Sequence, residues 1–475
     1  MTAHTKREAM ALPFSARDAL LWTGGELRRG SVNTSFRGVS IDTRNLAEGE
    51  LFIAIRGPQH DAHAFLKRAL AAGAAGLLVE TGVVLPTTPA EVAVLAVPDT
   101  TRALGELAAG HRANFNGPVV AITGSNGKTT SKEMCAAILS QRAPCLRNAG
   151  NLNNQFGLPL TLLRRSAEDR AVVVEIGMNH RGEIAPLAAI AAPTVGVITN
   201  VGMAHIEHLG SQEAIAQEKG DLIAVLPASG TAVLNADDPW VLSQRPRTRA
   251  QILCFGHARK ADVRAENVVS LGTRGFAFEL CTPQGRAGVH MAGLSETAIA
   301  NALAATAAAL AAGASLEHAC AGLAAHQPVG GRMEQVRLPR NIILIDDTYN
   351  ANPQSVAVAL RCLAELKGNS RGIAILGDMG ELGPAAEAAH RAAGELAAQL
   401  KLDFLFALGE YAGAVSEGAV AAGMDPDRVC VGENHGEVSE RVQKLLQGND
   451  WVLVKGSRSM HMERVVQALR TNGSS

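Results

Sequence analysis

Residues 119–130 indicate the fold of the central part of the chain. They read Val119-Val120-Ala121-Ile122-Thr123-Gly124-Ser125-Asn126-Gly127-Lys128-Thr129-Thr130. The short apolar run at its start, rich in β-branched residues, predicts a buried strand, and the pattern SKEMCAAIL that follows predicts a helix. A strand, a glycine turn and a helix N-terminus together make a cradle whose backbone N–H groups converge on phosphate. We therefore expect a phosphate-binding loop after residue 123.

The loop is shorter than the standard Walker A motif. A GxxxxGK pattern would need glycine at position 122, where this chain has Ile122. The shortened GxxGKT form favours a subset of nucleotide enzymes over a generic kinase or GTPase. Lys128 would place a positive charge near the β- and γ-phosphates, and Thr129 would offer its hydroxyl to Mg²⁺.

The chain length and the order of the apolar runs predict an α/β protein of about three domains. At roughly 150 residues per domain, 475 residues give about three. From about Pro118, apolar runs alternate with helical stretches, as in parallel sheets with crossover helices. The expected strands are residues 119–123, 171–176, 195–199 and 231–234, then residues 342–346, 373–376, 404–408 and 451–454.

The predicted boundaries divide the chain into three parts. Residues 1–113 form a small α/β N-terminal domain with a strand near 51–55 and a helix at 64–72. Residues 114–326 form the central P-loop domain with a mainly parallel sheet. The Gln327-Pro328-Val329-Gly330-Gly331 stretch reads as a hinge. Residues 327–475 then form a C-terminal Rossmann-like domain.

Composition and charge argue against several classes of protein. Lys and Arg number 44 against 45 Asp and Glu, and aromatic residues make up 3%. Broad nucleic-acid binding or a disordered chain would need a strong charge excess, so a polyanion must be held by a local site. The N-terminus has no apolar block of signal-peptide length, which favours the cytoplasm. Residues 298–314 are uncharged but mostly alanine, so a core helix is expected there, with no membrane insertion.

Two expected strand ends carry candidate metal ligands. Glu175 ends one apolar run, and His205 follows the next one after a short glycine-containing loop. In open parallel sheets, ligands bind outside the carboxyl ends of the strands, so both side chains are expected to face the phosphate loop. Mg²⁺ prefers oxygen ligands, which makes Glu175 the simpler assignment. A histidine at a strand end is structural at least as often as it is a ligand.

Four further features of the sequence can be interpreted as functional or as merely structural. By composition, Lys219 is expected on a solvent-exposed helix face. Arg332 is expected at the surface, although it could also reach a phosphate from the next domain. The segment 346–353 places two acids and two amides after a strand and before a proline-started helix, as ligand loops do. Lys455 and Arg458, in KGSR, would suit a phosphate or carboxylate, although an anion-free turn is also compatible.

The motifs as a set resemble the Mur ligase superfamily. TGSNGKTT (123–130), EIGMNH (175–180), AHIE (204–207), DDTYNANP (346–353) and KGSR (455–458) occur in this order. NAGNLNNQFGLP (148–159) and GDMGELG (377–383) are similar to members that join D-alanyl-D-alanine to UDP-N-acetylmuramoyl-tripeptide. The likeness runs from about Phe36 to the C-terminus, and the polar dozen residues at the N-terminus have no counterpart.

The resemblance implies an ATP-dependent ligase, an acyl-phosphate intermediate and a monomer. It implies a catalytic set of Lys128, Lys219, His205, Arg332 and Asp347. It implies an ATP site made of Gly124, Ser125, Asn126, Gly127, Lys128, Thr129, Thr130, Asn301, Arg332, Asp347, Tyr349 and Asn350. It implies two Mg²⁺ ions held by Thr129, Glu175, His205 and Lys219, with Lys219 carbamylated by CO₂.

The resemblance also implies where the other substrates bind. The residues matched to the UDP-sugar, peptide and dipeptide are Ser40, Asp42, Arg44, Asp61, His63, Asn151, Asn154, Asn352, Lys455 and Arg458. The chain departs from the family at residues 294–298, which read Leu-Ser-Glu-Thr-Ala where Gly-x-His-Asn is usual. Asn301 is then the remaining match for the adenine contact.

Two other functions compete with this interpretation. One is a different member of the superfamily, which adds a diamino acid or extends folate with glutamate; the chain has no Asp-Asn-Pro-Arg signature for diaminopimelate. The other is a non-ligase P-loop NTPase that acts as a mechanical or regulatory switch.

Overall fold

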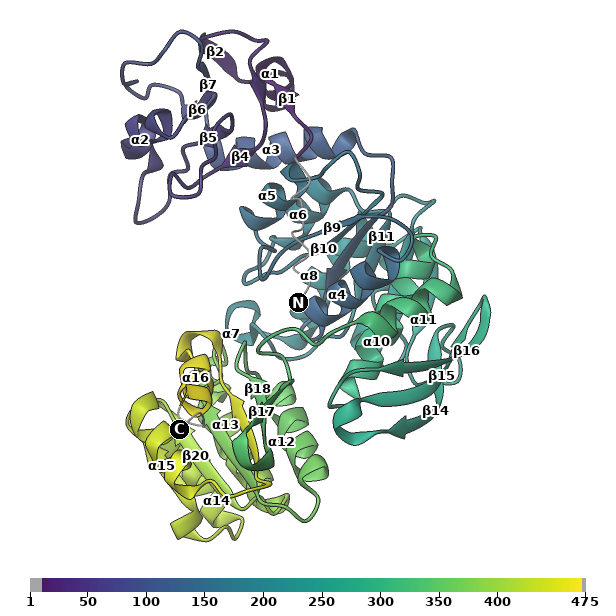
Figure 1. Ribbon diagram of the computed structural model, residues 1–475. Helices are drawn as coiled ribbons and strands as arrows, with labels where there is room; N and C mark the ends of the chain where they lie inside the picture. Colours follow the sequence, from purple (N-terminus) through teal and green to yellow (C-terminus); the bar gives the residue numbers. More distant parts are fainter. Residues whose placement is uncertain (1–10, 472–475) are drawn as a thin grey trace.

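The computed structural model describes residues 11–471. The first ten residues, which include most of the N-terminal dozen without a family counterpart, lie outside the described residues. Three α/β regions follow one another along the chain, with the central region between the other two (Figure 1). In the described range, no helix is long and apolar enough to cross a membrane.

The N-terminal region is built on a five-stranded sheet in the order β2-β7-β6-β5-β4. β2 is antiparallel to β7, and the other neighbours are parallel. The expected helix at 64–72 is present as a 3₁₀ turn followed by α2. The elements are β1 (Phe14–Ser15), α1 (Ala16–Thr23), β2 (Glu26–Arg29), β3 (Ser35–Phe36), β4 (Val39–Ser40), β5 (Leu51–Ile53), η1 (Ala62–Phe65), α2 (Leu66–Ala71), β6 (Gly76–Glu80), β7 (Ala93–Val97) and α3 (Thr100–Ala113).

The central region contains a six-stranded, fully parallel sheet in the order β13-β12-β11-β8-β10-β9. The four strands predicted here are confirmed to within a residue at each end. The elements are β8 (Val119–Thr123), α4 (Lys128–Leu139), β9 (Cys145–Arg147), α5 (Gly157–Leu163), β10 (Ala171–Glu175), α6 (Ile184–Ala191), β11 (Val195–Ile198), α7 (Ile206–Leu209), α8 (Gln212–Ala224), β12 (Thr231–Asn235), α9 (Pro239–Leu242), η2 (Arg245–Arg247) and β13 (Gln251–Phe255).

An antiparallel sheet that the sequence analysis did not predict is appended to the central region. Its elements are β14 (Arg264–Ser270), η3 (Gly272–Arg274), β15 (Phe276–Thr282) and β16 (Gly285–Met291). The helices α10 (Thr297–Ala311) and α11 (Leu316–Ala325) follow. α10 is buried over most of its length among residues of the central sheet and of α4, which confirms a core helix in the alanine-rich stretch.

The C-terminal region has a six-stranded sheet in the order β17-β18-β22-β19-β20-β21. Only the edge strand β17 is antiparallel to its neighbour. The four predicted strands are confirmed. The elements are β17 (Glu334–Leu338), η4 (Pro339–Asn341), β18 (Ile342–Asp347), α12 (Pro353–Lys367), β19 (Gly372–Gly377), η5 (Gly383–Ala385), α13 (Ala386–Gln399), β20 (Phe404–Leu408), α14 (Ala412–Ala421), η6 (Pro426–Arg428), β21 (Val429–Gly432), α15 (His435–Leu445), β22 (Trp451–Lys455), η7 (Arg458–Met460) and α16 (Glu463–Thr471).

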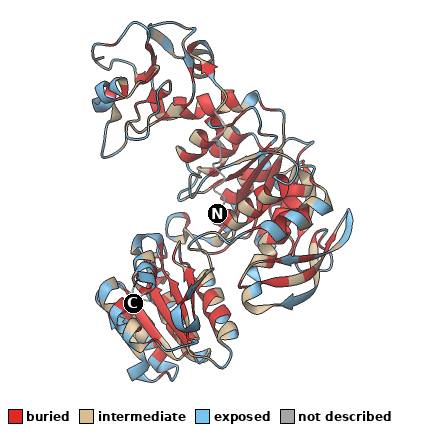
Figure 2. Ribbon diagram, in the orientation of Figure 1, coloured by how far each residue is buried: buried red, intermediate tan, exposed pale blue. Residues whose placement is uncertain are grey.

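The sheets carry the buried cores, and helices cover them on both faces in the central and C-terminal regions (Figure 2). Such strands read as continuous apolar runs because both faces are buried, which is why they could be recognised in the sequence. The mixed α/β architecture that we predicted is thus confirmed. The boundaries 1–113, 114–326 and 327–475 remain a proposal.

One apolar contact joins the central and C-terminal regions. Leu294 lies after the antiparallel sheet of the central region, yet it packs into the core beneath the C-terminal sheet. The thiol of Cys362, on α12, donates a hydrogen bond to the Leu294 carbonyl oxygen (3.0 Å). The two regions therefore share a buried contact close to the candidate site.

Candidate functional site

The phosphate loop predicted after residue 123 lies between β8 and α4, and two glycines give it its shape. Gly124 (φ +151) and Gly127 (φ +80) both have positive φ angles that L side chains rarely adopt. A Cβ on Gly124 would lie 1.8 Å from Thr199 Oγ1, and one on Gly127 would lie 2.1 Å from Asn301 Oδ1. The loop backbone therefore approaches its neighbours as closely as glycine permits.

The end of β11 holds the loop in place. The side-chain oxygen of Asn200 accepts a hydrogen bond from the backbone N–H of Asn126 (2.9 Å), and the Asn200 backbone carbonyl accepts one from the backbone N–H of Ser125 (3.0 Å). Thr199 donates its hydroxyl to the Asn126 carbonyl (2.6 Å). Thr199 and Asn200 were not among the predicted site residues, although their place at a strand end beside the loop was a usable signal.

Lys128, the first residue of α4, is folded back over the loop. Its Nζ donates to the Gly124 carbonyl (2.8 Å). Burial lowers the pKa of Lys128, and the nearby Arg332 charge lowers it further, while Glu175 opposes this effect. Lys128 and Arg332 therefore lie close enough at the phosphate loop for their charges to repel.

Glu175 and Thr129 lie together at the carboxyl end of β10, as the metal prediction requires. Thr129 donates its hydroxyl to Glu175 Oε2 (2.5 Å), and Asn153 donates its amide to Oε1 (2.8 Å). Glu175 is only 2% exposed. In residues 11–471 no cationic side chain forms an ion pair with it. A buried carboxylate that lacks a cation is costly, and its hard oxygen atoms beside a phosphate loop fit Mg²⁺.

His205 reaches the same cleft from the start of α7, with a positive φ of 65°. Its Nδ1 lies against a carboxylate oxygen of Glu381 in the C-terminal region. This contact lowers the pKa of the Glu381 carboxyl below its usual range. Glu381 belongs to the GDMGELG motif, to which the sequence analysis assigned no site role.

Lys219 is buried in α8, and it does not line the cleft. Its exposed fraction is 1%, so the interpretation of this position as a solvated helix face is wrong. Burial, reinforced by the charge of Lys128, holds the pKa of Lys219 well below its ordinary value. In the described part of the chain, no hydrogen bond or ion pair engages its amine. A neutral buried amine is the form that reacts with CO₂.

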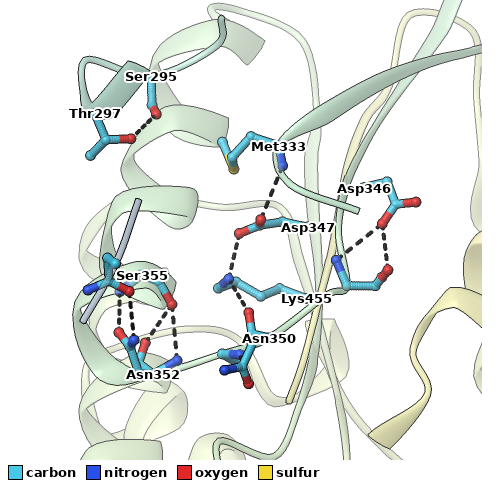
Figure 3. Close-up of polar contacts among 12 residues, drawn as sticks. Ser295, Thr297, Met333, Asp346, Asp347, Asn350, Asn352, Ser355 and Lys455 are labelled. Carbon is cyan, nitrogen blue, oxygen red and sulfur yellow. Dashed lines mark hydrogen bonds and ion pairs between the residues drawn. The ribbon is translucent and has the colours of Figure 1, made fainter. Parts of the chain in front are cut away.

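The C-terminal wall of the site is a network around Lys455, drawn in Figure 3. Lys455 is 1% exposed, and its Nζ donates to Asp347 Oδ2 (2.5 Å) and to the Asn350 carbonyl (2.9 Å). The backbone N–H of Met333 donates to Asp347 Oδ1 (3.1 Å). Lys455 and Asp347 therefore neutralise each other across two neighbouring strands, β18 and β22.

Arg332 and Tyr349 are stacked in the cleft. The guanidinium carbon of Arg332 lies 3.9 Å from the centre of the Tyr349 ring, and the Arg332 Nε is buried without a hydrogen-bond partner among residues 11–471. Burial raises the pKa of the Tyr349 hydroxyl. A buried guanidinium N–H that has no partner is costly, so this pair has an open hydrogen-bonding position.

The cleft between the central and C-terminal regions has a volume of about 1130 Å³ and brings most of the predicted site together. The predicted residues that line it are Ser125, Asn126, Gly127, Lys128, Thr129, Thr130, Asn151, Asn154, Glu175, His205, Asn301, Arg332, Asp347, Tyr349, Asn350, Asn352, Lys455 and Arg458.

Direct contacts close one end of this cleft. Asn352 caps α12 through its side-chain oxygen, and its amide donates to Asn126 Oδ1 (2.7 Å) in the phosphate loop. Asn126 in turn donates to Gln354 (3.3 Å). At the departure from the family pattern, Ser295 and Thr297 line the cleft and bond to each other (2.7 Å). This part of the cleft wall thus carries two small hydroxyl side chains.

The residues matched to the UDP-sugar lie in the N-terminal region, outside this cleft. Arg44 donates to Asp42, and this bond lowers the pKa of Asp42 to about 2. His63 uses both ring nitrogens within the fold: Nδ1 contacts Asp61 (2.5 Å), and Nε2 accepts from the Glu80 backbone (3.0 Å). Asp61 and His63 thus have partners within the fold, and their predicted role at the UDP-sugar remains a proposal.

Comparisons with known proteins point to one family. Three family models match the chain: the Mur ligase family catalytic domain over residues 35–112, the Mur ligase middle domain over 122–309, and the Mur ligase glutamate ligase domain over 331–458. The UDP-N-acetylmuramoyl-tripeptide–D-alanyl-D-alanine ligase of Escherichia coli strain K12 is 39% identical, over 95% of this chain and 97% of its own length.

Solved structures are similar over nearly the whole chain. A crystal structure of MurF from Acinetobacter baumannii has a TM-score of 0.87 and 34% identity, and covers 97% of this chain and 99% of its own. MurF ligase from Thermotoga maritima, solved in complex with ADP, has a TM-score of 0.80 and 26% identity, covering 92% of this chain and 97% of its own. The chain belongs to the Mur ligase family.

Proposed function

We propose that this chain is an ATP-dependent carboxylate–amine ligase of the acid–D-amino-acid type. It joins D-alanyl-D-alanine to UDP-N-acetylmuramoyl-tripeptide through an acyl phosphate and so completes the pentapeptide precursor of peptidoglycan. The observation that carries the proposal is the cleft in which the phosphate loop faces Arg332 and the Lys455–Asp347 network of the other region. Relatives that carry the name of this reaction align with more than nine-tenths of the chain.

The chemistry follows from the reactants. A carboxylate is a poor electrophile, so its oxygen first attacks the γ-phosphorus of ATP, and the bond to the β-phosphate oxygen breaks with release of ADP. The dipeptide amine then attacks the acyl carbon and loses a proton. The tetrahedral intermediate expels phosphate, and an amide remains.

The protein's part in this reaction is to position and to neutralise. Lys128 and Arg332 offset the repulsion between the carboxylate and the γ-phosphate, and the glycine loop presents its backbone N–H groups to the phosphates. Mg²⁺ held by Thr129 and Glu175 would supply further charge neutralisation. Closure about Gly330 and Gly331 would exclude water that could hydrolyse the acyl phosphate.

Lys219 enters the proposal as a carbamate. The low pKa of its buried amine favours the neutral nucleophile, which attacks CO₂ and loses a proton to give an N-carboxylate. This reaction converts a neutral amine into an anionic carboxylate with two oxygen atoms. Lys219 and His205 would then hold a second Mg²⁺.

The three regions suit three substrates. We assign the UDP-sugar to residues 1–113, with Ser40, Asp42 and Arg44 in its pocket, ATP to residues 114–326, and the dipeptide to residues 327–475. Asn151 and Asn154 lie on the cleft wall where the peptide would reach the phosphate loop. We place the enzyme in the cytoplasm, where ATP and UDP-sugars are available, and expect it to act as a monomer.

ADP formation tests this function and separates it from its rivals. With ATP, Mg²⁺ and UDP-N-acetylmuramoyl-tripeptide, D-alanyl-D-alanine should support turnover, whereas a diamino acid or glutamate should not. Strong ATP hydrolysis in the absence of sugar nucleotide and dipeptide would instead indicate a P-loop switch protein. Lys128→Ala should abolish the dipeptide-dependent turnover.

A further inference from the structure

The two carboxylate oxygens of Glu175 are each engaged by a neutral donor. The Thr129 hydroxyl donates to Oε2 (2.5 Å), and the Asn153 amide donates to Oε1 (2.8 Å). Thr129 belongs to the phosphate loop, whereas Asn153 comes from the NAGNLNNQFGLP segment, where only its neighbours Asn151 and Asn154 have a proposed substrate role. The amide of Asn153 is directed at the metal-binding carboxylate.

The segment that carries Asn153 is fastened to the end of β10 by its own backbone and by Asn148. The fully buried Asn148 accepts from the Glu175 backbone N–H (2.9 Å) and donates to the Glu175 carbonyl (3.2 Å). The Gly177 N–H donates to the Asn153 carbonyl (3.0 Å). A Cβ on Gly177 would lie 2.7 Å from the Asn153 amide nitrogen, so the packing there is tight. The hydrogen bonds of Asn148 and of the Asn153 carbonyl hold the segment without the Asn153 amide, and the tight packing against Gly177 limits where that amide can lie.

We propose that Asn153 is a positioning residue that orients Glu175 toward the cation, and that it is not a substrate contact. By holding Oε1, the amide fixes the rotation of the carboxylate and leaves Oε2 beside Thr129, at the mouth of the phosphate loop. Outer partners of this kind commonly set the affinity of a metal site. The inference rests on the proposed function only in taking Mg²⁺ as the ion that accompanies the nucleotide.

The chemistry of the side chain fits this role. An amide N–H₂ donates a hydrogen bond without carrying charge, so it holds the carboxylate and leaves its negative charge in place. A lysine at this position would neutralise that charge. An aspartate would set a like charge within hydrogen-bonding distance of Glu175. The amide is therefore suited to orient a carboxylate that must remain negative for a cation.

The test is calorimetric titration of ADP into the full-length protein, in EDTA and with saturating Mg²⁺. For Asn153→Ala we expect the gain in ADP affinity on adding Mg²⁺ to fall by about tenfold or more, with metal-free ADP affinity unchanged. Asn153→Ser, whose hydroxyl is too short to reach Glu175, should behave alike and guards against misfolding of the alanine variant. Asn33→Ala, at an exposed position of the N-terminal region, is the control for a lost asparagine.

A second titration separates positioning from substrate contact. UDP-N-acetylmuramoyl-tripeptide should bind Asn153→Ala as it binds the unaltered protein, whereas Asn151→Ala should weaken it. The proposal is overturned if Asn153→Ala keeps the full Mg²⁺-dependent gain, or if it loses tripeptide affinity instead. Both titrations measure binding without turnover, so a protein that bound its ligands but made no dipeptide-dependent ADP would refute the proposed function and leave this test readable.

Discussion

Replacement of Lys455 by methionine should destabilise the C-terminal region through the loss of a buried charge, with little loss of apolar packing. Methionine has a similar length and no charge, so the change removes the 2.5 Å bond to Asp347 and little volume. Lys455 is 1% exposed, and the Asp347 side chain is 13% exposed. The change therefore leaves a largely buried carboxylate without its cation.

The magnitude follows from the burial of both groups. Removal of one partner of a buried ion pair costs about 3–5 kcal/mol, and we expect the lower end, about 3 kcal/mol, because water reaches part of Asp347. The Asn350 carbonyl also loses its donor. Removal of both charges in Asp347→Asn with Lys455→Met should recover a large part of the loss, giving a coupling free energy of about 2 kcal/mol.

Urea unfolding followed by tryptophan fluorescence measures these changes. Each of the three regions holds a single tryptophan, namely Trp22, Trp240 and Trp451. A background that carries Trp22→Phe and Trp240→Phe would report on Trp451 alone, which lies on the same strand as Lys455. If Lys455→Met cost less than about 1 kcal/mol, or if the double variant were simply additive, the pair would not be the stabilising contact that we describe.

Three further predictions concern the other parts of the molecule. Gly124→Ala should weaken ADP binding by about tenfold or more, because the glycine-only backbone and the clash with Thr199 each cost about 1–3 kcal/mol; calorimetry with near-normal affinity would contradict this. Lys219→Ala should lose ligase activity and regain part of it with short-chain carboxylic acids, and ¹³C NMR with labelled CO₂ should show a carbamate in the unaltered protein; an absence of both would leave Lys219 as a structural lysine. Asp42 should titrate near pH 2 by NMR, since Arg44 lowers its pKa to about 2. The ion pair then stabilises the fold fully above the ordinary aspartate pKa of about 4, and this stabilisation is lost as the pH falls through 2. An ordinary aspartate pKa for Asp42 would refute the ion pair.

Buried parallel strands and the phosphate loop could be predicted from the sequence because their signals are local. A run such as residues 119–123 is apolar throughout since both faces of its sheet are covered, and GxxGKT directly marks the turn that follows. The antiparallel sheet of β14, β15 and β16 was missed. β15 alternates buried and half-buried positions, and β14 has no buried position, so neither strand forms a continuous apolar run.

Side-chain partners could not be predicted, because they join distant parts of the chain. Lys455 was assigned to an external anion, yet its partner is Asp347, 108 positions away. Lys219 reads as a surface lysine by composition, and only the packing of α8 shows that it is buried. Asn153 and Glu381 lay in motifs that we quoted, but their contacts with Glu175 and His205 exist only in three dimensions.

The most direct test of the central claim is isotope transfer from the tripeptide to phosphate. UDP-N-acetylmuramoyl-tripeptide labelled with ¹⁸O in its reacting carboxylate is incubated with ATP, Mg²⁺ and D-alanyl-D-alanine, and the released phosphate is analysed by mass spectrometry. An acyl phosphate predicts phosphate that carries one ¹⁸O atom, formed together with the pentapeptide product. Unlabelled phosphate, or phosphate release without pentapeptide, would contradict the ligase mechanism proposed for this chain.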